Sequence, residues 1–278
     1  MRFVIGCAVF VLCCYFSVTV HAEAVVPGHP EFLPEKLDYG QYIADPRRAR
    51  FGGGLLAGSG GELQFDTAIG GAFPFFNFKP GDPPFEKVQF AGSAVVLPRW
   101  DIHHDLDQVG ANFRAGLSLS AMHGPWGWRL QLLHESDHLG DEFILRTGQR
   151  KRLAYLRQEI DLGASYFPYP DLRLYAEGSY GFSIGESNMA WKVQGGLEWE
   201  GGPRLPLGAR LYGATDLQSY QEVHWNPDWT TQVGVVEWNV PRSRSLRIFA
   251  EYHLGHDPLG EFFYQGLNFC ETGLALDF

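Results

Sequence analysis

The sequence is poor in cysteine, with four in 278 residues, and three of these (Cys7, Cys13 and Cys14) lie in its first apolar stretch. If that stretch is removed on export, Cys270 remains alone and no internal disulfide can form. The cysteine count therefore excludes a small disulfide-stapled fold, although the chain is expected to mature in an oxidising compartment. The stability of the fold has to come from hydrogen-bonded architecture.

Basic residues and long apolar runs are also scarce. The chain has 22 Lys and Arg against 32 Asp and Glu, a formal net charge of -10. Such a chain offers no basic patch for phosphates, so no nucleic acid is expected as a partner. After residue 22 no apolar run approaches the roughly 18 residues that a membrane helix needs. The sequence therefore argues against both a nucleic-acid-binding protein and a helical membrane protein.

The first 49 residues predict export. Arg2 is followed by an apolar run from Phe3 to Val20 and by Val20-His21-Ala22, which predicts a signal peptide at residues 1–22, cleaved after Ala22. An uncleaved anchor helix is the alternative. Residues 23–49 contain four prolines and no sustained period, so we predict an N-terminal periplasmic tail, with a segment tucked into a barrel lumen as the other interpretation.

Aromatic residues and glycine are abundant: 8 Trp, 12 Tyr, 21 Phe and 34 Gly. From residue 87 onward apolar and polar residues alternate over long segments, which is the pattern of half-buried strands. The last such segment, residues 271–278, ends on Phe278 and resembles the signal that the barrel-insertion machinery of bacterial outer membranes recognises. A typical alternating segment places Trp126, Trp128, Leu130 and Leu132 opposite Gly127, Arg129 and Gln131.

These patterns predict that residues 50–278 form an all-β, transmembrane antiparallel up-and-down β-barrel of about 12 strands, surrounded by outer-membrane lipids. Ten strands would remain if the segments at 51–56 and 62–69 fail. Residues 72–86, with four prolines, are predicted to form a loop. Short turns, among them 241–243, are predicted to lie on the periplasmic side, and longer polar loops, among them 137–150, on the external side. A soluble sandwich also alternates, but its strands are shorter than several of these. The inward positions carry both charge signs, so the lumen should be packed with paired polar side chains.

One candidate catalytic pair is His134 and Ser136, which fall on the same outward face of a strand. A histidine beside a serine can act as general base to a nucleophile. The pair resembles the outer-membrane phospholipase A family, whose barrel presents a His-x-Ser pair to lipid, completed by an Asn on the next strand. No Asn occurs between His138 and Ile160 here, and Gln158 is predicted to lie too far along its strand to replace it. The alternative is that these polar residues simply end the apolar band.

A repeated motif suggests a second kind of site. Asp137-x-Leu139-Gly140-Asp141-x-Phe143 recurs as Asp257-x-Leu259-Gly260-Glu261-x-Phe263. Carboxylates beside a Gly turn can hold Ca²⁺, whereas His134 and His138 with Asp141 would suit Zn²⁺. Turn chemistry, with Gly for positive φ and acids for solvation, is the alternative. Of the two ions, Ca²⁺ is kept as the candidate cofactor, and the candidate metal ligands are Asp137, His138, Asp141, Asp257 and Glu261.

Residues 44–278 resemble the bacterial family called domain of unknown function 1207. The resemblance depends on the segment 136–143, on His224-Trp225-Asn226-Pro227, and on Glu251-Tyr252-His253 with Gly255-His256. That family is outer-membrane-like and has no assigned activity, so the resemblance implies fold and location without a mechanism. The leading hypothesis is an outer-membrane barrel for envelope structure or small-solute exchange. A lipid acyl hydrolase using Ser136 and His134, and an adhesin or receptor working through external loops, are the alternatives, and the oligomeric state stays open.

Overall fold

A computed structural model describes residues 30–78, 85–149, 152–153, 155–185, 189–240 and 244–277. The predicted signal peptide at residues 1–22, the turn predicted at 241–243 and the terminal Phe278 lie outside the described residues. Among the described residues no helix combines the length and apolar composition that a membrane-spanning helix needs.

Strands dominate the described residues, and most of them run for ten residues or more. One α-helix, α1 (Asp141–Thr147), and four short 3₁₀ turns at Ile102–His104, Pro206–Gly208, Gln221–Val223 and Gly260–Phe262 accompany them. The strands are β1 (Glu31–Phe32), β2 (Phe51–Gly58), β3 (Leu63–Phe78), β4 (Lys87–Asp101), β5 (Asp107–His123), β6 (Trp126–Leu139), β7 (Leu156–Tyr169), β8 (Leu172–Ile184), β9 (Trp191–Gly201), β10 (Arg210–Tyr220), β11 (Pro227–Val240), β12 (Arg244–Leu254) and β13 (Phe269–Asp277).

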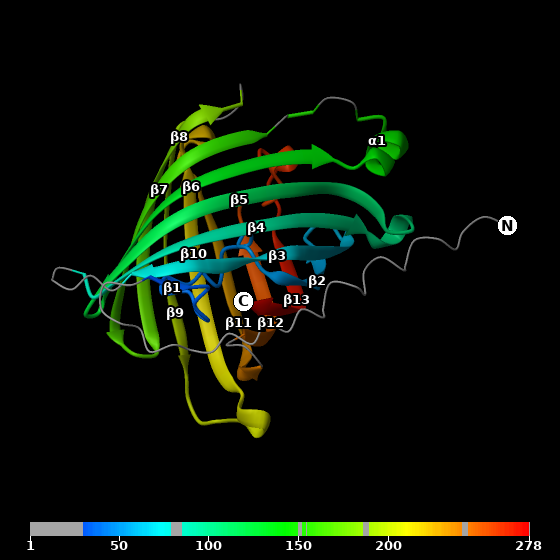
Figure 1. The fold of residues 1–278 in the computed structure, drawn as a ribbon. Coiled ribbons are helices and arrows are strands. Elements are labelled where there is room, and N and C mark those ends of the chain that lie inside the picture. The colour runs from blue at the N-terminus through cyan, green and yellow to red at the C-terminus, as the bar shows by residue number, and fades with distance from the viewer. Residues whose placement is uncertain are drawn as a thin grey trace.

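Twelve of these strands, β2 to β13, form a closed antiparallel barrel within the described part of the chain. Each pairs with the next in sequence, and β13 pairs with β2 to close the ring (Figure 1). The two-residue β1 adds to the end of β3. Closure leaves the ring without an edge strand, as a membrane-spanning sheet requires. The predicted transmembrane up-and-down barrel is confirmed, with twelve strands and not ten.

The two ends of the barrel differ. At one end, which we call the short-turn end, β5 and β6 are joined at 124–125, and β7 and β8 at 170–171. At the other, the long-loop end, β6 and β7 are joined by 140–155, and β12 and β13 by 255–268. The sequence-based assignment of the short-turn end to the periplasm stays a prediction.

The predicted loop at 72–86 is wrong for its first half. β3 continues to Phe78, which pairs with Val88 of β4. The register shifts between Pro74 and Phe76, so a bulge accommodates the proline that argued against a strand here. The connection between β3 and β4 is accordingly shorter than the sequence suggested.

The predicted loop at 137–150 also contains regular structure. β6 extends to Leu139, and α1 follows it directly. Asp141 and Glu142 occupy the first turn of α1, and Gly148 ends it in the left-handed conformation with φ 70°. A helix of seven residues makes only two turns, which is too short for a 3.6-residue period to be recognised in the sequence.

Side chains divide strictly between the two faces of the wall. On β6 and β7 the outward Leu130 and Leu162 are 49% and 64% exposed, whereas the inward Glu135 and Arg157 are 2% and 1% exposed. A wall that is apolar outside and charged inside suits hydrocarbon on its outer face. The predicted inward charges are indeed buried, with the exception of the half-buried Arg210.

The outward position of Leu162 makes a test of this partition. We expect Leu162→Arg to lower the free energy of unfolding by about 2–4 kcal/mol, because a charge at the middle of the lipid-facing wall is costly. Leu145→Arg is the matched control, since Leu145 on α1 is 85% exposed at the long-loop end, and we expect a change within about 0.5 kcal/mol. Urea unfolding of protein refolded into lipid vesicles measures both; equal effects would contradict the partition.

Candidate functional site

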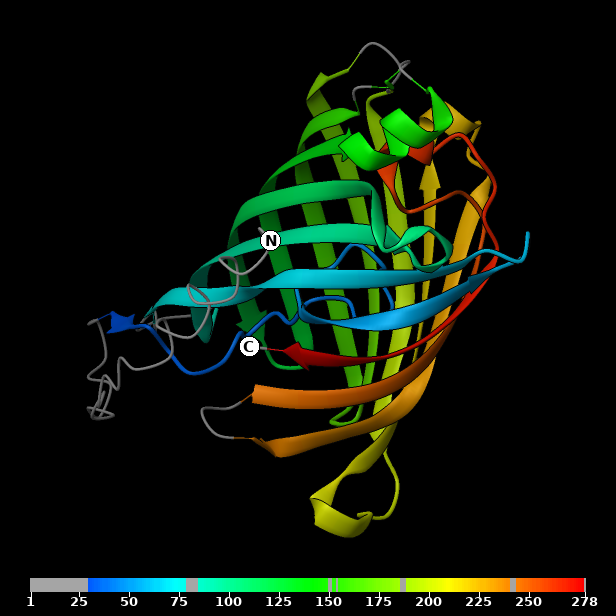
Figure 2. The same cartoon turned by 90° about the vertical axis from the view of Figure 1, so that its right-hand side faces the viewer.

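The segment before β2 lies inside the barrel, as Figure 2 shows for the chain between β1 and β2. We call residues 38–49 the lumenal segment. Tyr39, Tyr42, Ala44, Arg47 and Arg48 are each no more than 4% exposed. These residues therefore lie in the barrel lumen, as in the second of the two interpretations of the sequence, and do not form part of a periplasmic tail.

Three lumen glutamates hold the lumenal segment, and each also pairs with an arginine of the wall. Tyr42 Oη donates to Glu177 at 3.0 Å, and the Ile43 N–H donates to Glu198 at 2.6 Å. Arg47 pairs with Glu135 at 3.2 Å. The three wall pairs are Arg129–Glu177 at 2.7 Å, Arg173–Glu198 at 3.1 Å and Arg114–Glu135 at 3.3 Å.

Arg47 is the deepest anchor of the segment. Its guanidinium lies 5.3 to 5.8 Å from the ring centroids of Tyr155, Tyr220 and Phe263, within the range of a cation–π contact. Arg114 in turn donates to the Arg47 carbonyl at 2.6 Å. The segment is thus fixed both to strands and to the loops of the long-loop end.

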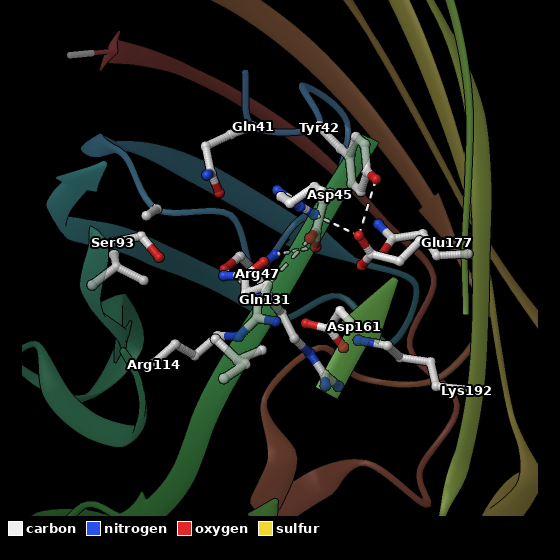
Figure 3. A pocket seen from close by; sticks show the side chains of 15 residues that line it. Gln41, Tyr42, Asp45, Arg47, Ser93, Arg114, Gln131, Asp161, Glu177 and Lys192 are labelled. Atoms are coloured by element: carbon white, nitrogen blue, oxygen red, sulfur yellow. Dashed lines mark hydrogen bonds and ion pairs between the residues drawn. The ribbon is translucent and has the colours of Figure 1, made fainter. Parts of the chain in front are cut away.

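Around Arg47 little space remains between the segment and the strands, whereas a pocket of about 420 Å³ lies beside Ile43 and Arg48 nearer the short-turn end. The pocket that Figure 3 shows, lined by Gln41, Asp45, Gln131 and Lys192 among others, has a volume of about 30 Å³. That volume holds one or two water molecules. Burial alone would raise the pKa of the Asp45 carboxyl, but the Arg114 guanidinium and the Arg47 N–H hold it below its ordinary value. The carboxylate therefore stays charged beside Arg114.

The repeated motif packs against itself at the long-loop end. Leu139 of the first copy and Leu259 of the second lie in one buried apolar cluster with Val109 and Phe262, and Phe143 packs against it. The loop between β12 and β13 thereby lies over β5 and β6. This packing accounts for three of the four apolar positions of the motif, while Phe263 packs with Tyr155 and Tyr220. A Cβ at Gly140 would clash with the Gln108 carbonyl, and one at Gly260 would clash with the Asp137 carboxylate, so both positions require glycine.

The candidate metal ligands are dispersed. Asp137 points into the lumen and His138 points outward from the same strand, while Asp141 begins α1. Asp257 accepts hydrogen bonds from Arg99 at 2.8 and 3.0 Å, and Glu261 accepts one from the Leu153 N–H at 2.8 Å. Among the described residues no group of three or more His, Cys, Asp or Glu side chains is arranged to hold a metal ion.

The candidate catalytic pair lies on the outer wall. His134 and Ser136 both face outward from β6, and two residues along a strand separate them by about 7 Å. Gln158 of β7 is the direct cross-strand partner of His134, and Ser183 of β8 is the partner of Gln158. The prediction that Gln158 lies too far along its strand is therefore wrong. Side chains opposite each other in this way are about 5 Å apart at Cβ. Within the described ranges, no side-chain hydrogen bond is recorded for His134, Ser136 or Gln158.

Beside this pair the wall is hollowed. A depression of about 580 Å³ is bounded by His134 and Gln158 on one side and by Phe73 and Phe75 of β3 on the other. Its floor consists of small residues on β4 and β5, and the bulkier Leu117, Leu132 and Phe182 rim it. Apolar depressions of this size are typical of ligand sites.

Comparison with protein families decides the affiliation of the chain. A family model described as "Protein of unknown function (DUF1207)" matches residues 15–278. The chain belongs to the DUF1207 family. A comparison with curated proteins finds no match.

Solved structures similar to this DUF1207 protein are outer-membrane barrels. The outer membrane phospholipase A of Escherichia coli matches with a TM-score of 0.53 and 11% identity, covering 85% of this chain and 95% of that one. The Salmonella typhi phospholipase dimer with bound calcium matches with a TM-score of 0.51 and 12% identity, covering 84% and 93%. At these identities the likeness establishes the fold alone.

Proposed function

We propose that this DUF1207 protein is a bacterial outer-membrane barrel with a structural role in the envelope and a lumen that is closed to solutes. The lumenal segment carries this proposal, because Tyr42, Ile43 and Arg47 occupy the lumen. Beside Arg47 the remaining pocket measures only about 30 Å³, although a pocket of about 420 Å³ lies nearer the short-turn end. Small-solute exchange, the other half of the leading hypothesis, would require this segment to move. The likeness to outer-membrane barrels supports the location, and export with cleavage after Ala22, followed by membrane insertion, belongs to the same proposal.

Conductance of the intact protein tests the closed lumen. Purified barrel inserted into planar lipid bilayers should show no openings above the leak of the bare membrane. The reason is that paired charges and the lumenal segment fill the interior of a twelve-strand barrel. Stable openings of the unmodified protein would contradict the proposal.

A second candidate function is lipid acyl hydrolysis at the outer wall, and one observation favours it: Gln158 lies directly opposite His134. In this function the His134 imidazole removes the proton from the Ser136 hydroxyl, whose oxygen attacks a lipid ester carbonyl. The imidazolium gives this proton to the leaving alcohol as the ester C–O bond breaks, and water then hydrolyses the acyl-serine. The Gln158 amide oxygen accepts the other imidazole N–H and so orients the ring. Lumenal solutes play no part in this reaction, so it is compatible with a closed barrel.

Release of fatty acid from phospholipid vesicles tests this second function. We expect Ser136→Ala to abolish release, and His134→Ala to reduce it by about 10²–10⁴-fold, the usual contribution of a general base. Ser118→Ala is the matched control, because Ser118 lies on the neighbouring β5 and alternates with the outward Leu117 and Leu119. Release that is the same in all four proteins would rule out this chemistry.

A further inference from the structure

The polar residues His134 and Ser136 have apolar neighbours on the adjoining strands. Ser136 pairs with Phe113 of β5 and with Leu156 of β7, and both of these face outward. On β6 itself the outward polar row continues with His138 to the end of the strand. The polar side chains therefore form an island between apolar neighbours on β5 and β7 that is open toward the long-loop end.

The depth of the island supports this placement. Trp126 begins β6 at the short-turn end, where its ring lies 4.5 Å from that of Tyr166, as in an aromatic girdle. His134 lies eight residues further on, about 26 Å along the strand. A strand tilt of about 40° reduces this to about 20 Å along the membrane normal, inside an apolar band about 25 Å tall.

Polar side chains at that depth need a partner. An amide or imidazole facing hydrocarbon without a hydrogen bond costs several kcal/mol, and polar groups at this depth usually mark functional sites. No side-chain hydrogen bond of the described residues involves His134 or Gln158. The partner must therefore come from the surroundings of the barrel.

The depression beside the island has the shape for such a partner. Gly92 and Ala94 of β4 and Ala115 of β5 form its floor, and Ala115 is the direct neighbour of His134. A molecule that fills it meets apolar surface along most of its length and polar groups only at the edge made by His134 and Gln158. This division matches an acyl chain that ends in an ester.

We propose that the depression is a binding site for one acyl chain of a membrane glycerolipid, with its ester group at His134 and Gln158. The Gln158 amide N–H donates to an ester oxygen while its amide oxygen accepts the His134 imidazole N–H, and the chain lies over Ala94 and Ala115 toward Phe73. This site extends the second proposed function, since it would hold the ester beside Ser136. Binding itself does not require that hydrolysis occurs.

Retention of lipid through purification in detergent tests the site by native mass spectrometry. The wild type should carry one glycerolipid. Ala94→Leu and Ala115→Leu should lose it, because the larger side chains fill the floor. Ala176→Leu is the matched control, since Ala176 is an exposed outward alanine of β8 that does not line the depression. Retention by both filled variants would overturn the site, as would loss in all three.

A second measurement uses the unmodified protein, so that a folding defect cannot decide the outcome. A phospholipid with a diazirine in its acyl chain, incorporated in vesicles, should cross-link to β3, β4 and β5 around residues 73–75 and 92–94. Labelling spread evenly over all strands would overturn the site. A dimer mass, with a second copy of the chain covering these residues, would also overturn it. Ser136→Ala should keep both the lipid and the labelling pattern, so failure of hydrolysis and failure of binding are distinguishable.

Discussion

Replacing the lumenal segment, residues 38–49, by a glycine–serine sequence of equal length should turn the closed barrel into a conducting one. The replacement removes the side chains of Tyr39, Tyr42, Arg47 and Arg48, which fill the lumen. Discrete openings should then appear in planar bilayers where the intact protein shows none. The interior would be lined by the remaining charged wall residues, as in water-filled barrels.

The barrel should still fold after this replacement. Glu177, Glu198 and Glu135 keep their wall arginines Arg129, Arg173 and Arg114, so each of these three carboxylates keeps a counter-charge. The strand pairing that closes the ring does not involve the segment. A heat-modifiable shift between boiled and unboiled samples on a gel checks folding.

A peptide of the sequence 38–49, added from the side of the short-turn end, provides the control for this experiment. It should restore the closed state, whereas a peptide of the same composition in scrambled order should not. If the replaced protein folds and still does not conduct, the lumenal segment is not what closes the barrel.

The barrel wall could be predicted from the sequence because the polarity of each wall residue follows from the side of the wall that its side chain faces. On β6 the outward and inward side chains alternate without exception from Trp126 to Leu139. That alternation follows directly from hydrocarbon on one side and polar groups on the other. Pro74 was misleading because a bulge can place a proline in a strand, and only the pairing with β4 shows the bulge.

The contacts that order the lumenal segment could not be predicted, because they join residues distant in the sequence, and a place in the lumen was only one of two interpretations of residues 23–49. Tyr42 and Glu177 are separated by 135 residues, and Ile43 and Glu198 by 155. An irregular backbone held by such contacts has no period. The only sequence signal was the excess of inward acidic residues, which calls for cations from elsewhere in the chain; Arg47 and Arg48 are two of them.

The outer-wall site was predicted in part. The shared face of His134 and Ser136 follows from the spacing of two residues. The position of Gln158 depends on the register between β6 and β7, which the loop 140–155 and its helix α1 set. A loop of that length leaves the register open to several values, so sequence reasoning assigned the wrong one. For the repeated Asp-x-Leu-Gly motif the sequence offered metal binding and turn chemistry but not packing, because the contact between its two leucines, Leu139 and Leu259, cannot be inferred from the sequence.

Arg47→Ala should be the most destabilising single change in the lumenal segment. Removing one partner of a buried ion pair costs about 3–5 kcal/mol, and we expect about 3 kcal/mol here because Arg114 still pairs with Glu135. The substitution also empties the space between the rings of Tyr155, Tyr220 and Phe263. Urea unfolding in lipid vesicles measures the loss of unfolding free energy.

Arg146→Ala is the matched control for this change, because Arg146 on α1 makes two ion pairs at the surface, with Asp101 at 2.9 Å and Asp107 at 3.1 Å. Surface pairs of this kind contribute at most about 1 kcal/mol. Equal losses of unfolding free energy for Arg47→Ala and Arg146→Ala would mean that the lumen is hydrated enough to screen the charge of Arg47. A loss confined to Arg47 would instead mean that the segment and the wall unfold as one cooperative unit, because the arginine stabilises strands to which it is not covalently adjacent.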